Sequence, residues 1–166
     1  MMASPLDRVA RREAPGAGVR VSELRNLQLF LVSDLSRDNA LESSGCTKMT
    51  VGPGRYLASG EGAAEAFADV AGQEHLTVQD VSHARTVLVL AGDAVRDLMS
   101  KVCAIDLHPA VFPKGAYAVT PVAGIEAVIR CVDEDRFELY VVRSFARHVL
   151  EAIIHRGAEY GVAWSG

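Results

Sequence analysis

Three residue types that could form a catalytic triad lie close together near the middle of the sequence. Asp80, Ser82 and His83 supply an acid, a hydroxyl nucleophile and a base. Successive side chains of a strand point to opposite faces, so His83 would point away from both Asp80 and Ser82. No GxSxG turn surrounds the serine to present it as a nucleophile. We therefore predict a polar corner that anchors a turn, and we assign no catalytic residue in the chain.

The histidines and cysteines do not have the spacing of a metal site. His148 and His155 are seven residues apart, which on a helix is about two turns and ~10 Å, too far to share one ion. The others are spread over separate segments: His75, His83, His108, Cys46, Cys103 and Cys131. We predict no metal site. Three unpaired thiols without a CxxC pair are typical of small core residues in a reducing cytoplasm.

Two glycine pairs could indicate a phosphate-binding loop. They form GPG at 52–54 and GEG at 60–62. Neither completes the GxGxxG pattern of a dinucleotide site or the GxxxxGK[ST] pattern of a P-loop. We interpret these glycines as turn residues with positive φ and assign no cofactor-binding residue, whether for flavin, nicotinamide or nucleotide.

The clearest pattern of secondary structure covers residues 78–154. The expected elements are an extended segment over 78–91, a helix capped by Asp93, strands over 116–122, 125–132 and 137–142, and a helix capped by Ser144. The order is strand, strand, helix, three strands, helix. It predicts an α+β fold in which antiparallel strands form a layer with helices on one side.

The chain before this region is less regular. We expect a flexible N-terminal arm over 1–22, a small α+β half over 23–76 and a second half over 77–166. The elements expected in the first half are a strand over 24–32, a short helix within 33–45, two strands within 49–59 and a helix over 61–71. The fold would then consist of two small antiparallel-sheet-plus-helix layers. The last six residues are expected to be mobile, with docking of Trp164 as the alternative.

Composition excludes some classes of partner. The formal charge of −4 over 166 residues provides no basic patch for nucleic acid or an anionic membrane. The sequence has no run of 18 apolar residues, and its first residues lack the apolar region of a secretory signal. We expect a cytoplasmic protein that does not bind a membrane. A hydrophobic content of 49% must either be buried in a well-filled monomer or be shared with partners.

A loop between two prolines is the best candidate for a shared surface. The segment 107–114, LHPAVFPK, places Val111 and Phe112 where the chain is too irregular for a core layer. Arg143 and Phe145, at the start of the last helix, are the residue types that interfaces favour. We predict these four residues as partner contacts. In the alternative, Phe112 folds back over its own sheet.

Four motifs carry a resemblance to a known family. In chain order they are DVSH, IDLHP, FPKG and LYVVRSFA. Together they resemble the gamma subunit of heterotetrameric sarcosine oxidase and, more distantly, the folate-binding part of glycine-cleavage aminomethyltransferases. The close match covers about half of the chain, and a looser match reaches back to Leu24. The resemblance implies the aminomethyltransferase folate-binding fold and an accessory, noncatalytic role in assembly.

The resemblance also implies partners and their cofactors. In such complexes the alpha and beta subunits carry NAD, FAD, FMN and the tetrahydrofolate site, and the delta subunit carries zinc. The complex oxidatively demethylates an N-methyl amino acid and transfers the methylene to tetrahydrofolate. Sarcosine, N-methylglutamate and related amines are all open as substrates, and so are oxygen and other electron carriers as acceptor. This chain would itself hold no cofactor.

The folate-binding relatives place an aspartate beside the folate, in a Gly-Gly-Ile-x-Asp-Asp segment. Its two aspartate positions fall on Ile125 and Glu126 in this sequence. The first is apolar, so the resemblance implies a folate-binding fold without its chemistry, with Glu126 as the one acid that could substitute. A stand-alone folate-binding transferase or repair-type protein is the alternative, and an orphan interaction domain is a third interpretation.

Overall fold

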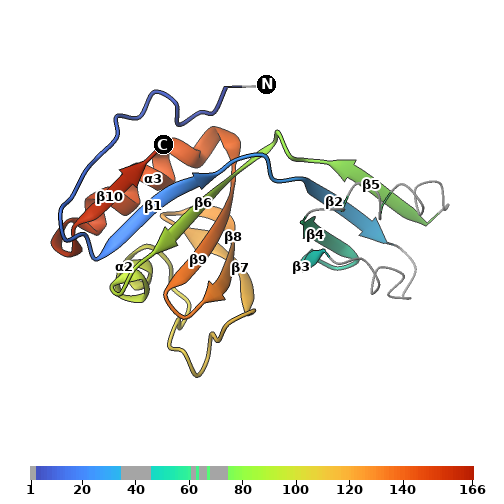
Figure 1. The fold of residues 1–166 in the computed structure, drawn as a ribbon. Helices are drawn as coiled ribbons and strands as arrows, with labels where there is room; N and C mark the ends of the chain where they lie inside the picture. Colours follow the sequence, from blue (N-terminus) through green and yellow to red (C-terminus); the bar gives the residue numbers. More distant parts are fainter. Residues whose placement is uncertain (1–2, 35–45, 61–62, 64–66, 68–74) are drawn as a thin grey trace. The chain divides into compact units, whose positions relative to one another are not determined.

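The computed structural model describes residues 3–34, 46–60, 63, 67 and 75–166, and the chain divides into two compact units. Unit 1 joins Met1–Arg25 to Arg85–Gly166, and unit 2 is Asn26–Ala84. We expected three consecutive segments with boundaries after residues 22 and 76, whereas unit 1 is interrupted by unit 2. The reason is that β1 (Val19–Leu24) pairs with β6 (Arg85–Ala91) in one sheet, as Figure 1 shows.

Unit 1 contains a six-stranded sheet in the order β10-β1-β6-β9-β8-β7. Its remaining strands are β7 (Tyr117–Val122), β8 (Ile125–Asp133), β9 (Arg136–Val142) and β10 (Val162–Ser165). The strands predicted over 116–122, 125–132 and 137–142 are confirmed, and β7, β8 and β9 pair antiparallel in sequence order. The pair β1–β10 is parallel, so the sheet is mixed.

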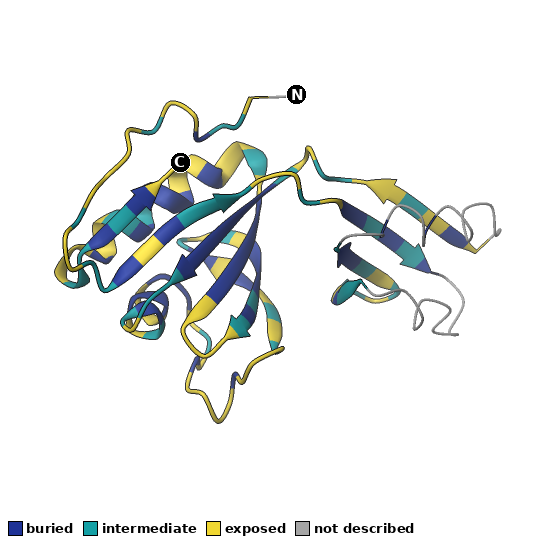
Figure 2. Ribbon diagram, in the orientation of Figure 1, coloured by how far each residue is buried: buried dark blue, intermediate teal, exposed yellow. Residues whose placement is uncertain are grey.

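Two helices cover one face of this sheet, as the expected α+β layer requires. They are α2 (Val95–Val102) and α3 (Ala146–Arg156), with 3-10 turns at η1 (Arg143–Phe145) and η2 (Ala158–Tyr160). Four apolar residues at helical spacing in α2 are buried in the core: Val95, Leu98, Met99 and Val102. Figure 2 shows buried residues along β6 and β9, the two central strands against which the helices pack.

The expected helix caps are wrong. Asp93 and Ser144 do not cap α2 and α3, and neither helix has a side-chain cap at its start. The amide of Ala94 instead donates to the carbonyl of Gly18, and the amide of Val95 donates to that of Gly92. Backbone acceptors therefore satisfy the first amides of α2, which removes the need for a capping side chain.

Both ends of the described chain are fixed to unit 1, in contrast to the expected arm and mobile tail. Residues 19–22 of the expected arm belong to β1, and Leu6 is 1% exposed in the core. Trp164 in β10 is 2% exposed, which supports the docking alternative. Its backbone also forms two hydrogen bonds with Arg12, of 3.1 and 2.8 Å.

Unit 2 contains a four-stranded sheet in the order β3-β4-β2-β5. Its strands are β2 (Leu29–Asp34), β3 (Thr47–Gly52), β4 (Arg55–Ser59) and β5 (Leu76–Asp80). The two strands predicted around Gly52–Gly54 are confirmed, and Gly54 has a φ of +62°. The single strand expected over 24–32 is divided between β1 and β2 at a turn in which Asn26 has a φ of 61°.

The two helices expected in the first half fall mostly outside the described residues. Of the segment 33–45, only Ser33 and Asp34 are described, and they end β2. Of the segment 61–71, Ala63 and Phe67 are described, and Phe67 packs on Phe30 with ring centroids 5.3 Å apart. Within the described part of the chain, no helix is long and apolar enough to cross a membrane.

Candidate functional site

The segment Asp80–His83 forms the polar corner that the sequence predicts. The backbone amide of Ser82 donates to Oδ1 of Asp80 at 2.8 Å, and the amide of Leu29 donates to Oγ of Ser82 at 2.9 Å. The serine hydroxyl thus fixes the start of β2 and does not face a base. His83 is exposed, and no hydrogen bond of its side chain is found among the described residues.

The electrostatics of this corner favour an ionised Asp80. Hydrogen bonding by the side chain and then the backbone amide of Ser82 lowers the pKa of Asp80, and the nearby His83 lowers it slightly further. A carboxylate with a lowered pKa is a poor general base at neutral pH. The corner therefore has a structural role in unit 2.

The metal-binding residue types are dispersed in space as they are in sequence. Among the described residues, no group of three His, Cys, Asp or Glu side chains could hold a metal ion. His148 approaches the carbonyl of Ala123 at 3.3 Å, and Nδ1 of His108 accepts from the amide of Ala110 at 3.2 Å. These two rings therefore contact backbone groups.

The cysteines are free thiols, and two of them belong to the core of unit 1. Burial raises the pKa of the Cys103 thiol, and it also raises the pKa of Cys131, with Arg96 acting in the opposite direction. A raised thiol pKa reduces the reactive thiolate fraction at neutral pH. Their environment suits small core residues.

One of the four predicted contact residues, Phe112, is buried in unit 1. Phe112 is only 7% exposed and stacks on Phe137 of β9, with ring centroids 6.3 Å apart and planes 15° apart. The alternative, in which the ring folds back over its own sheet, is therefore confirmed. Phe112 is therefore a core residue of unit 1.

Arg96 explains why the proline-flanked loop turns inward. Its guanidinium donates to the carbonyls of Leu107 and Phe112, the latter at 3.2 Å, and its Nε donates to the carbonyl of Glu134 at 2.9 Å. The same guanidinium lies 5.0 Å from the ring centroid of Phe137. One helix side chain thus fixes the loop against the β8–β9 hairpin. Sequence pattern could not reveal this, because an arginine between apolar helix positions normally lies in solvent.

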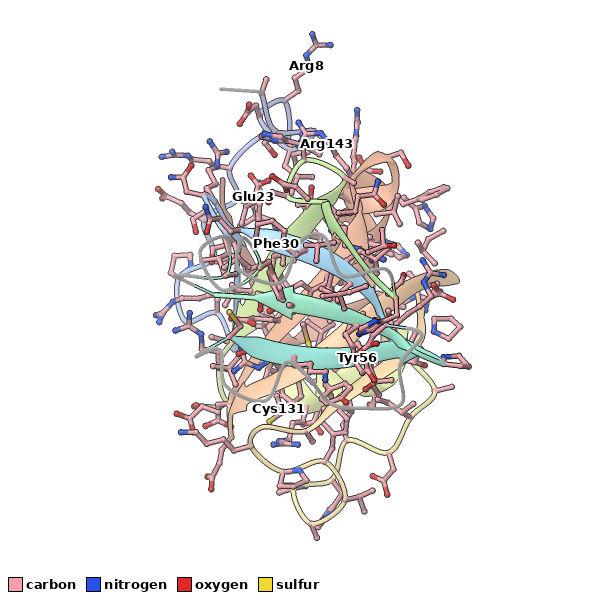
Figure 3. All side chains as sticks on the ribbon, turned by 90° about the vertical axis from the view of Figure 1, so that its right-hand side faces the viewer. Arg8, Glu23, Phe30, Tyr56, Cys131 and Arg143 are labelled. Carbon is pink, nitrogen blue, oxygen red and sulfur yellow. The ribbon has the colours of Figure 1, made fainter. Side chains whose placement is uncertain are left out.

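The other three predicted contact residues are accessible at the surface of unit 1. Val111 is 61% exposed and Phe145 is 46% exposed. Arg143 is half-buried and donates to the carbonyl of Ala3, so the N-terminal segment passes beside it. Figure 3 shows Arg143 on the same end of the molecule as Arg8. Val111 and Phe145 are available to a partner, whereas Arg143 already has an internal acceptor.

The structure adds three exposed apolar residues that sequence analysis missed. Tyr117 and Val119 of β7 and Val142 of β9 are each about 40% exposed. The strand register puts Val119 opposite Val128 and Val128 opposite Tyr140. Because residues two apart in a strand share a face, Tyr117, Val119 and Val142 all lie on the sheet face opposite the helices. Both faces of these strands are apolar, so alternation did not distinguish this surface from the core.

A buried carboxylate on the same face also escaped sequence analysis. Glu138 is 7% exposed, accepts from the Tyr140 hydroxyl at 2.6 Å and forms an ion pair with Arg130 at 3.2 Å. Two donors, one of them charged, compensate for the loss of water around the carboxylate. Glu126, the one acid that could substitute for the relatives' aspartate, is instead exposed in β8 opposite Pro121.

The comparisons with known proteins agree on one family. The family described as sarcosine oxidase, gamma subunit matches residues 43–159. The sarcosine oxidase gamma subunit of Corynebacterium sp. (strain U-96) is 28% identical over 123 residues, which are 72% of this chain and 60% of that protein. The gamma subunit of Corynebacterium sp. (strain P-1) is 29% identical over 119 residues, 70% of this chain and 59% of that protein. The chain thus spans about three fifths of the length of these relatives.

Solved structures confirm the α+β fold. A chain of heterotetrameric sarcosine oxidase from Corynebacterium sp. U-96, in complex with pyrrole 2-carboxylate, superposes with a TM-score of 0.81 at 23% identity. The superposition covers 99% of both chains. Glycine cleavage system aminomethyltransferase T from Bartonella henselae superposes with a TM-score of 0.57 at 16% identity, over 90% of this chain and 48% of that one. The fold is therefore aminomethyltransferase-like, as expected.

Proposed function

Because the chain belongs to the sarcosine oxidase gamma subunit family, we propose that it is an accessory, noncatalytic subunit of a heterotetrameric sarcosine oxidase-type complex. The observation that carries this proposal is the agreement in fold with a chain of such an assembly along 99% of both chains.

The partners in this proposal are the alpha, beta and delta subunits, and they would supply all the cofactors. FAD, FMN, NAD, tetrahydrofolate and zinc would bind to those subunits. The complex would oxidatively demethylate an N-methyl amino acid and pass the methylene to tetrahydrofolate. The role of this chain would be to complete the assembly.

The exposed apolar residues of unit 1 are the best surface for such a partner. Val142 and Phe145 lie close in sequence where β9 leads into α3, and Tyr117 and Val119 extend the apolar surface along the same sheet face. Aromatic side chains such as those of Tyr117 and Phe145 are among the residue types enriched at interfaces. Val111 provides a further exposed apolar contact on the loop.

Co-expression with the flavin-carrying chains tests this proposal. We expect the tagged chain to co-elute with them in gel filtration. Phe145→Asp should weaken this association by roughly 2 kcal/mol or more, because it places a charge in an apolar contact. His155→Asp is the matched control, since it adds the same carboxylate at an exposed position of α3 outside this surface. Equal loss with both variants, or a chain that never co-elutes, would contradict the proposal.

The likeness to aminomethyltransferase T keeps a folate-binding transferase as the second candidate. This chain corresponds to only 48% of that protein, so further protein would have to complete a folate pocket. Titration of the isolated chain with tetrahydrofolate, followed by fluorescence, separates the two functions. Micromolar binding that Glu126→Gln weakens would favour the transferase. The accessory role predicts no such binding.

A further inference from the structure

The loop between α2 and β7 carries a four-residue tip, which we define as residues 108–111. All four residues are exposed, Val111 most clearly at 61%. The residues on either side, Leu107 and Phe112, are buried in the core of unit 1. Figure 1 shows the loop projecting beyond the strands at the lower end of the view. The tip is thus a short surface projection with a buried anchor on each side.

Arg96 closes the base of the tip. Its Nη1 donates to the carbonyls of both anchors, Leu107 and Phe112, so one charged group holds the two ends of the tip together. The amides of Val111 and Phe112 both donate to the carbonyl of His108 at 2.8 Å. These bonds close a turn that exists before any partner arrives. A preformed contact lowers the entropic cost of binding.

Every backbone amide donor of the tip has an acceptor within the loop. The amide of His108 donates to Oδ1 of Asp106 at 2.8 Å, and the amide of Ala110 donates to Nδ1 of His108 at 3.2 Å. The amide of Val111 uses the carbonyl of His108, and Pro109 has no amide hydrogen. Burying a backbone donor that has lost its water is costly unless it has another acceptor. The donors of the tip can therefore be buried against a partner without this cost.

The composition of the loop also suits an apolar contact. The stretch 107–113, LHPAVFP, contains no acid, lysine or arginine. Charged residues are depleted at the centres of interfaces. Two of the four motifs that carry the family resemblance, IDLHP and FPKG, supply the side chains that fix the tip, namely Asp106, His108 and Phe112.

We propose that the tip inserts into an uncharged apolar pocket of a partner subunit, with Val111 as the residue buried most deeply there. A partner subunit is favoured over a second copy of this chain, because the family consists of subunits and the similar solved structure is heterotetrameric. This contact rests on the proposed function, and it adds which residues make the contact and which surface they need on the partner.

The test is the dissociation of the complex on dilution, with the released chain measured by gel filtration. Tagged flavin-carrying chains are co-expressed with the wild-type chain or with a variant. Val111→Asp should weaken the association by about 30-fold or more, because it buries an unpaired carboxylate. Val111→Thr has nearly the same shape and should weaken it by about tenfold, since its hydroxyl has no partner in an apolar pocket. The control His155→Asp, at an exposed position of α3, should stay within about twofold of wild type.

A second pair of variants tests the shape of the tip separately from its apolar surface. Asp106→Ala removes the acceptor of the His108 amide and should weaken the association by roughly fivefold. Asp106→Asn keeps Oδ1 as an acceptor and should restore the wild-type affinity. Equal losses with the two variants would show that the charge of Asp106 matters and would overturn the preformed tip.

Failure of this contact and failure of the proposed function give different results. If the wild-type chain co-elutes with its partners and both Val111 variants bind as well as wild type, the contact is overturned and the accessory role stands. A wild-type chain that never co-elutes contradicts the accessory role and the contact with it. A dimer of the isolated chain that Val111→Asp abolishes would assign the tip to a second copy and also overturn the proposal. Circular dichroism checks that the variants are folded, as the exposure of Val111 leads us to expect.

Discussion

Two phenylalanines that sequence analysis grouped together have opposite environments. Phe112 is 7% exposed and stacks on Phe137, whereas Phe145 is 46% exposed. For both residues, the type of side chain and the neighbouring sequence predicted a contact with a partner. What separates them is a tertiary contact, because Arg96 fixes the backbone on both sides of the Phe112 loop.

Alanine substitutions at these two positions should therefore differ in stability. Phe112→Ala should lower the free energy of unfolding by ~3 kcal/mol, because it leaves a cavity beside Phe137. Phe145→Ala should change it by about 0.5 kcal/mol or less, since the ring is largely in solvent. Urea unfolding followed by circular dichroism measures both. Similar losses at the two positions would show that the assignment of one to the core and one to the surface is mistaken.

The lowered pKa of Asp80 has a consequence for pH dependence. A carboxyl whose pKa is lower in the folded than in the unfolded state stabilises the fold fully above its unfolded pKa, which is ~3.9. That contribution is lost as pH falls from there through the folded pKa. We expect Asp80→Asn to remove this part of the acid dependence.

The measurement is the unfolding midpoint in urea between pH 3 and pH 7, compared for wild type and Asp80→Asn. The difference in stability between them should be constant above about pH 5 and shrink as the pH falls below 4. His83→Ala is the control for the same corner, and it should change stability little because His83 is exposed. A difference that grows on acidification would mean that Asp80 is not stabilised in its ionised form.

At the scale of elements, the loop between α2 and β7 depends on a single helix side chain. Arg96→Met keeps the aliphatic stem but leaves the carbonyls of Leu107 and Phe112 without their donor. We expect a loss of ~2–3 kcal/mol in the free energy of unfolding, because these bonds involve a charged group. Arg96→Lys should recover only part of it, since an ammonium lacks the planar fork. Hydrogen exchange of the loop amides should accelerate in both variants, and an unchanged loop would contradict this role.

Elements defined by local pattern could be predicted, and those defined by distant pairing could not. The hairpin of β7 and β8 follows from alternation on either side of Ala123-Gly124, and α2 follows from its apolar spacing. The division of 24–32 between two sheets does not, because the break depends on Asn26 adopting a positive φ. The same distinction applies to the residues of the candidate site. Exposure of Val111 and Phe145 follows local sequence, whereas the roles of Arg96 and Glu138 depend on residues far away in the chain.

At the scale of the molecule, Trp164 joins the C-terminal strand to the core. Trp164→Ala should lower the free energy of unfolding by ~3–5 kcal/mol, because the indole is 2% exposed. Trp164→Phe should cost less than half as much, since the indole nitrogen has no hydrogen-bond partner among the described residues to lose. Thermal unfolding of the two variants provides the comparison. A loss with Trp164→Phe as large as with Trp164→Ala would indicate that the indole nitrogen does bind a partner.

The position of β1 between β6 and β10 also determines the order in which the sheet can assemble on the ribosome. β1 emerges early, but its two neighbours begin only at Arg85 and Val162. Both edges of this strand therefore stay unpaired until β6 is translated, and one edge stays unpaired until β10 is translated. Arg20, Ser22 and Glu23 put polar side chains along it, which opposes pairing with other nascent chains in that interval. Synthesis of β10 closes the last free edge of β1, so the N-terminal strand is among the last parts of unit 1 to be completed.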